Sequence, residues 1–181
     1  MIEPAPPYRG EGPQALWHVS ENDSIRRFEP HHRPGHSLDE PLVWAIDTRH
    51  LPLYWFPREC PRATFWASSG TTHDDVVRFL AGDRDLRVHV VEPDWLDAMR
   101  TVRVVAYRLP DETFEAWDRF WISRVAVEPL ERVELGDLVA RHEHAGIRLE
   151  VDDHLPELWQ RVLASTLDYS GIRLRNARMA R

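Results

Sequence analysis

Short strand-like segments, separated at irregular intervals by helical ones, decide the fold class of this chain. Apolar or alternating residues predict strands at 15–20, 42–46, 62–67, 86–92, 102–109, 121–127, 133–135 and 147–151. Helical spacing predicts helices after the capping residue Thr72, at 93–99, at 137–144 and at 155–167. The segments do not alternate as regular βαβ units. The pattern therefore predicts an α+β fold with a mixed, mainly antiparallel sheet and flanking helices.

The length of 181 residues, 43% of them hydrophobic, suits one domain with a substantial core. The proline- and glycine-rich start predicts a flexible arm over residues 1–13, followed by a single domain over residues 14–169. Residues 170–181 read as a basic tail in solvent. The alternative for this tail is that Arg173 and Arg175 fold back over an anionic ligand.

Charge and residue usage exclude several classes of protein. The net charge is −7 and no lysine is present, which argues against long nucleic acid as a partner and excludes Schiff-base catalysis and a Walker-type lysine. The single cysteine, Cys60, cannot form a disulfide within the chain, and we interpret it as structural. With no long apolar run and no secretory signal, we expect a cytoplasmic protein without a membrane partner.

Two segments combine residue types suited to holding a nucleotide. The predicted strand 15–20 carries His18 and Ser20, which suit a ribose hydroxyl or a carboxamide. Aromatic side chains at Trp44 and Tyr54 can stack on a planar ring. Two further residues, Arg58 and Arg62, can contact a diphosphate. An equally open interpretation is a proline-bounded loop whose aromatic residues fill the core and whose arginines pair with surface acids.

With these residues, the chain resembles ADP-ribosyltransferase-like folds. In that superfamily an early strand supplies a histidine to the nicotinamide-side ribose, and a later segment supplies an aromatic residue that stacks on the nicotinamide ring. The resemblance assigns these roles to His18, beside Ser20, and to Trp44, Tyr54 or Trp55. It implies an ADP-ribosyltransferase-like fold and a site for NAD or ADP-ribose.

The resemblance also implies a catalytic glutamate, and here the sequence departs from it. The segment 120–129 is similar to the strand that carries this acid, but Phe120 or Trp121 stands at its position. A carboxylate there would stabilise an oxocarbenium-like state. Glu115 and Asp118, just upstream, are candidates to replace it, and Glu128 is a weaker candidate because it lies beyond the strand.

A second resemblance covers more of the chain. The segments Trp-His-Val-Ser, Phe-Pro-Arg-Glu-Cys-Pro-Arg and Ser-Gly-Ile-Arg-Leu-Arg-Asn resemble those of an uncharacterised bacterial protein family, a domain of unknown function. Such a resemblance implies no established activity.

We therefore predict a protein that binds a small NAD- or ADP-ribose-type nucleotide. It is either a divergent ADP-ribosyltransferase or a relative that has lost catalysis. One alternative is a metal-dependent hydrolase that uses the loop histidines His31, His32 and His36, with His142 and His144 as a second small group. Their spacing matches no metal motif, so we expect no metal. The remaining alternative is a non-enzymatic interaction protein.

Overall fold

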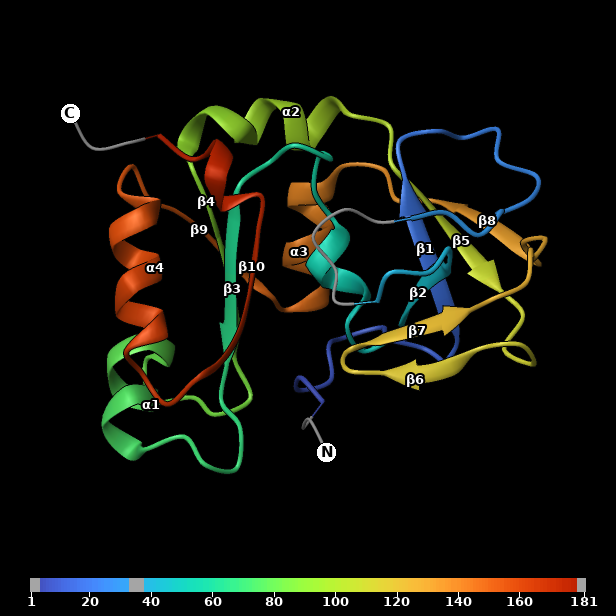
Figure 1. Cartoon of the computed structure of the whole chain (residues 1–181). Helices are drawn as coiled ribbons and strands as arrows, with labels where there is room; N and C mark the ends of the chain where they lie inside the picture. Colours follow the sequence, from blue (N-terminus) through green and yellow to red (C-terminus); the bar gives the residue numbers. More distant parts are fainter. Residues whose placement is uncertain (1–3, 33–37, 179–181) are drawn as a thin grey trace.

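Two β-sheets, a larger antiparallel one and a smaller mixed one, form the framework of the computed structural model, which describes residues 4–32 and 38–178 (Figure 1). Within these residues the larger sheet has the spatial order β6-β7-β2-β1-β5-β8, and the smaller has the order β10-β3-β4-β9. The strands of the larger sheet are β1 (Leu16–Ser20), β2 (Val43–Asp47), β5 (Val105–Leu109), β6 (Glu115–Trp117), β7 (Phe120–Ser123) and β8 (Glu131–Glu134). Those of the smaller sheet are β3 (Arg62–Trp66), β4 (Arg87–Val91), β9 (Arg148–Val151) and β10 (Asp168–Ile172).

The prediction of an α+β fold with mainly antiparallel pairing is confirmed. The pair β4–β9 is parallel and the other described strand pairs are antiparallel. The strands divide into two sheets, however, whereas a single mixed sheet was expected. Strand patterns show which segments are extended but not which of them pair, so this division was not visible in the sequence.

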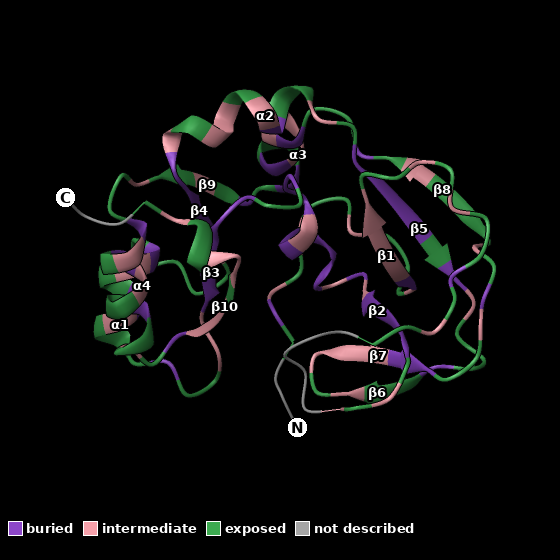
Figure 2. Cartoon of the chain, turned by 45° about the horizontal axis from the view of Figure 1, so that its top comes forward, coloured by how far each residue is buried: buried purple, intermediate pink, exposed green. Residues whose placement is uncertain are grey.

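Helices pack against both faces of the smaller sheet. The helices are α1 (His73–Leu80), α2 (Leu96–Thr101), α3 (Leu138–Ala145) and α4 (Leu155–Leu163), with short 3₁₀ helices η1 (Leu51–Tyr54), η2 (Pro93–Trp95) and η3 (Leu174–Asn176). Helices α1 and α4 lie side by side on the outer face, where Val76 and Leu158 pack against Phe65 and Val88 (Figures 1 and 2). No helix of the described residues is long and apolar enough to cross a membrane.

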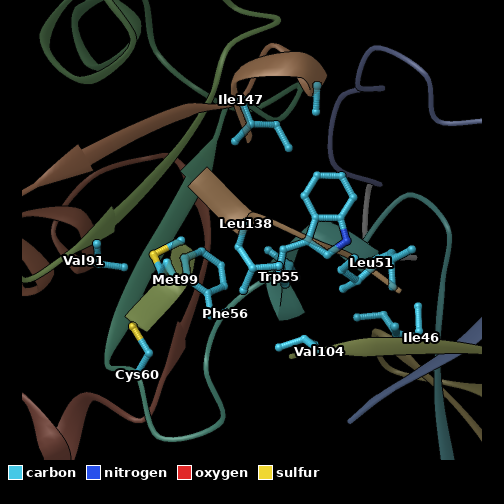
Figure 3. Close-up of a cluster of buried hydrophobic side chains, with 14 of the residues drawn as sticks. Ile46, Leu51, Trp55, Phe56, Cys60, Val91, Met99, Val104, Leu138 and Ile147 are labelled. Atoms are coloured by element: carbon cyan, nitrogen blue, oxygen red, sulfur yellow. The ribbon is translucent and has the colours of Figure 1, made fainter. Parts of the chain in front are cut away.

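The largest group of buried side chains fills the space between the two sheets (Figure 3). Ile46 comes from the larger sheet, Val91 from the smaller one, and Met99 and Leu138 from helices α2 and α3. Because this core covers the second face of the smaller sheet, all five positions of β3 and of β4 are buried. Continuous rather than alternating burial is typical of strands that are covered on both faces.

Both expected terminal segments pack onto the domain in part. Ala5 is fully buried, and the ring of Tyr8 lies edge-to-face on Trp55 at 5.3 Å between centroids. At the other end, residues 170–172 continue β10, so the boundary expected at residue 170 falls inside a strand. Helix α4 ends at Leu163 rather than near residue 167, because Ser165 Oγ donates to Val162 O and Thr166 N donates to Asp75 of α1.

Candidate functional site

A cavity of about 920 Å³ opens between the inner strands β1 and β2 of the larger sheet and the residues before β3 and after β10. This volume lies within the range of small-molecule sites. The six residues predicted to bind a nucleotide all line it: His18, Ser20, Trp44, Tyr54, Arg58 and Arg62. The structure thus brings together residues from β1, β2, η1 and the start of β3.

His18 is fixed in the cavity wall by its neighbours on the sheet. Its Nδ1 lies 3.0 Å from the carbonyl oxygen of Trp44 on the adjacent strand β2. Because a carbonyl can only accept, Nδ1 carries the proton, and a neutral ring then has its lone pair on Nε2. The ring also packs on Phe28 at 4.7 Å between centroids. Backbone and packing therefore set both the tautomer and the orientation of the ring.

The aromatic residues differ in how much ring surface they offer. Trp44 is only 5% exposed, and its ring lies edge-to-face against Trp117 and Phe120 at 5.7 and 5.5 Å. It forms part of the wall, so little of its face is open for stacking. Tyr54 and Phe120 are half-buried and line the same cavity, so their side chains are more exposed than that of Trp44.

Ser20 ends β1 at the rim of the cavity. Its Oγ accepts a hydrogen bond from Asn22 N at 3.1 Å, which shapes the turn after the strand. The hydroxyl hydrogen can still point to a ligand, because a serine hydroxyl is both donor and acceptor.

Arg62 is a buried cation in this wall. Nε donates to Leu53 O and Nη1 to Cys60 O, both at 3.0 Å, and the guanidinium lies over the rings of Phe56 and Tyr54 at 4.8 and 5.7 Å. Burial lowers the pKa of Arg62 to about 10. Among the described residues it forms no ion pair with a carboxylate. A buried charge without a counter-charge is costly.

Arg58 behaves differently from Arg62. Its side chain is exposed and lies 4.0 Å from Glu59 Oε1, while its backbone N–H donates to Glu21 Oε1 at 2.7 Å. It contributes to the rim of the cavity rather than to its floor.

The structure adds two arginines that were expected in a solvent-facing tail. Arg173 and Arg175 follow β10 and line the cavity beside Arg58 and Arg62. Their closeness depends on strand pairing between residues more than 100 positions apart, since Ile172 lies opposite Arg62. The sequence signal was the pair of arginines itself, for which folding back was the alternative to a tail in solvent.

None of the three acids considered as the catalytic glutamate lines the cavity. Phe120 lies in the wall, whereas Glu115 pairs with Arg124 at 2.5 Å on the surface and Glu128 lies 3.5 Å from Arg27. Asp118 occupies the turn of the β6–β7 hairpin with a φ of 53°. The carboxylates of the described cavity wall are Glu21 and Glu29.

The histidines considered as metal ligands do not gather into a site in the described part of the chain. No group of three or more potential metal ligands occurs there. His31 and His32 lie at the cavity rim, and His36 is outside the described residues. His142 faces the core, where its Nε2 lies 3.0 Å from His89 Nδ1, whereas His144 is exposed.

Cys60 is buried next to this cavity, and burial raises the pKa of its thiol to about 12. A thiol that stays protonated at neutral pH is a poor nucleophile. This environment agrees with the structural role predicted for it.

Comparison with known proteins identifies the family. The model of the Family of unknown function (DUF6886) matches residues 17–177, and the chain belongs to this family. No curated protein and no solved structure matches the chain. The matched region includes every residue of the cavity wall named above.

Proposed function

We propose that the cavity binds an NAD- or ADP-ribose-type nucleotide and that the fold is of the ADP-ribosyltransferase-like kind. The observation that carries this proposal is the meeting of three kinds of group in one cavity. An oriented histidine, half-buried aromatic side chains and a buried arginine without a counter-charge among the described residues line it together. A dinucleotide or ADP-ribose has a ribose, a planar base and a diphosphate that match these groups.

Each part of the ligand has a chemical counterpart in the wall. His18 and Ser20 present polar atoms to a ribose or a carboxamide, and Tyr54 and Phe120 present ring faces to a base. Arg62 presents a guanidinium to the diphosphate.

The proposed activity is binding without efficient cleavage of the nicotinamide bond. The resemblance puts Phe120 or Trp121 at the position of the acid that ADP-ribosyltransferase-like enzymes require, and Phe120 lines the cavity wall. An aromatic ring cannot stabilise a developing oxocarbenium charge as a carboxylate does. The family would then use the site for recognition.

A thermal-shift titration tests the proposal. Purified protein of measured metal content is titrated with NAD, ADP-ribose, AMP and nicotinamide. A ligand that binds only the folded state raises the melting temperature. We expect saturable shifts with NAD and ADP-ribose, and no nicotinamide release from NAD. Absence of a shift with all four ligands would reject the proposal.

The variant His18→Ala locates the binding. Loss of a hydrogen bond and a ring contact predicts an affinity for ADP-ribose about tenfold weaker, or about 1.4 kcal/mol. The matched control is His73→Ala, an exposed histidine on α1 outside the cavity wall. Equal affinity of both variants would remove His18 from the site.

A further inference from the structure

The segment after β10 carries arginine side chains into the cavity through a tightly constrained backbone. Gly171 has no room for a side chain, because an added Cβ would lie 2.6 Å from both Trp159 and Leu174. Arg173 follows with a φ of 57°, in the left-handed region that residues with a Cβ rarely adopt. Backbone strain of this kind persists only where the surroundings impose it.

Several contacts hold this segment against the loop before β3. Asn176 Nδ2 donates to Glu59 O at 2.8 Å, and Arg173 Nε donates to Arg58 O at 3.3 Å. The main chain of β10 is paired with β3 up to Ile172, opposite Arg62. The position of Arg173 in the wall is therefore set by the fold, and its side chain is not a loose surface group.

Positive charge accumulates at this end of the cavity. Nearby Arg173 adds to burial in lowering the pKa of Arg62, so the two guanidinium groups repel each other. Arg173 Nη2 lies 3.4 Å from Glu59 Oε1, a carboxylate that it shares with Arg58. Arg175 lines the same wall, and no described residue forms an ion pair with it.

The balance of arginine and carboxylate charges at this end of the cavity indicates how much negative charge a ligand would carry. Among the described residues, the four guanidinium groups of Arg58, Arg62, Arg173 and Arg175 face the two carboxylates of Glu21 and Glu59. Two positive charges therefore have no counterpart among the residues that the structure describes. A diphosphate that bridges two sugars carries two negative charges, whereas a phosphodiester or a carboxylate carries one.

We propose that Arg173, together with Arg62, binds the diphosphate of the ligand and makes the site selective for groups that carry two negative charges. The inference rests on the proposed function where it identifies the whole ligand as a nucleotide. That the ligand carries an anionic group is inferred from the charge arrangement alone. Glu59 competes with the ligand for Arg173, so it limits affinity while holding Asn176 in place.

Calorimetric titration of the full chain with ADP-ribose and with inorganic pyrophosphate tests the inference. The variant Arg173→Gln keeps a Cβ at the strained position, so the backbone cost is unchanged while the charge is removed. We expect binding of both probes to weaken tenfold or more, because hydrogen bonds to charged groups are the stronger ones. The matched control is Arg148→Gln, which removes an exposed arginine of β9 outside the cavity and is expected to bind like the wild type.

Glu59→Gln tests the competition directly. Glutamine retains an acceptor for Asn176 but removes the charge that pairs with Arg173. We expect pyrophosphate affinity to rise several-fold, whereas a fall would contradict the charge count.

The two probes separate failure of the inference from failure of the proposed function. Pyrophosphate binding that depends on Arg173, without ADP-ribose binding, would reject the nucleotide and support the anion site. Wild-type affinity of Arg173→Gln for ADP-ribose would overturn the inference even if the nucleotide binds. Failure of both probes to bind would overturn both.

Discussion

Basic residues occupy two contrasting environments in this lysine-free chain. At the junction of the two sheets, the basic groups Arg62, Arg87, His89 and His142 are buried, and none forms an ion pair with a described carboxylate. At the rim of the larger sheet, by contrast, the arginines are exposed and paired. Basic side chains are therefore energetically costly where they are buried and unpaired, whereas their charges are neutralised by ion pairs where they are exposed.

The exposed arginines at the rim have carboxylate partners within the chain. Arg124 contacts Glu40 at 2.9 Å and Glu115 at 2.5 Å, and Arg103 contacts both Asp23 and Glu134. Hydrogen bonds to these carboxylates raise the pKa of both arginines. No external anion is needed there.

At the junction, the described residues supply no carboxylate that pairs with the buried arginines. Arg87 donates from Nη2 to Arg49 O, but its Nε and Nη1 have no partner in the described residues, and burial lowers its pKa to about 10. Arg62 differs from Arg87 in lining the large cavity. The anion site that we propose therefore lies where an unmatched cation meets an accessible space, and not wherever arginines are numerous.

Acidification should destabilise the junction more than any single substitution. His142 donates from Nδ1 to Leu138 O, and a neutral His142 ring then accepts from His89 Nδ1 on Nε2. Burial lowers the pKa of His142 from 6.5 to about 4 and that of His89 well below 6.5. Below pH 6.5 the unfolded chain binds more protons than the folded one. Stability is therefore fully present above pH 6.5 and should fall by on the order of 3 kcal/mol from His142 alone as pH drops to 4.

Urea unfolding between pH 7 and pH 4 measures this loss. In His142→Gln the slope of the unfolding free energy against pH should be shallower, whatever the stability at pH 7. The control His144→Gln changes an exposed histidine of the same helix. Parallel curves for His142→Gln and the wild type would refute the role of the buried pair.

Arg62→Met should separate binding from stability. It removes a buried charge, which favours folding, but leaves the carbonyls of Leu53 and Cys60 without donors, which opposes it. We expect the two effects nearly to cancel in the unfolding free energy. Pyrophosphate affinity should fall about 30-fold, or about 2 kcal/mol. A large loss of stability with unchanged affinity would show that Arg62 is structural.

Gly171→Ala should disturb the support of Arg173. The new methyl group must displace the ring of Trp159 or the side chain of Leu174, and overpacking of this size costs about 1–2 kcal/mol. Trp159 packs edge-to-face on Tyr169 at 5.2 Å, which limits how far its ring can move. Thermal unfolding measures the loss, and Gly70→Ala, where an added Cβ meets nothing, is the control. Equal melting temperatures would mean that the segment is looser than its contacts indicate.

Elements with strong local signals were predictable from the sequence. Thr72 accepts from Asp75 N at the start of α1, as predicted, and α3 (Leu138–Ala145) lies close to the predicted range 137–144. The edge strands β6 and β10 were missed. Their sequences, Glu-Ala-Trp and Asp-Tyr-Ser-Gly-Ile, lack a clear apolar period because pairing at an edge depends on backbone groups.

The candidate site was predictable only in part for a related reason. His18 and Trp44 were identified from the residue types on short strands, and their adjacency follows from β1–β2 pairing. The approach of Arg173 to Arg62 depends on the register of β10 against β3. No local pattern encodes that register, so the basic end of the cavity became visible only in the folded chain.

Arg124→Gln should have the smallest effect, and it completes the contrast between the two regions. Exposed ion pairs lose little when one partner is removed, because water solvates the carboxylates that remain. The melting temperature should fall less than in Gly171→Ala, and the difference from the wild type should shrink in high salt as the pairs are screened. Pyrophosphate affinity should be unchanged, since Arg124 does not line the cavity. A fall in affinity would mean that arginine number, rather than unmatched charge at one end of the cavity, governs anion binding.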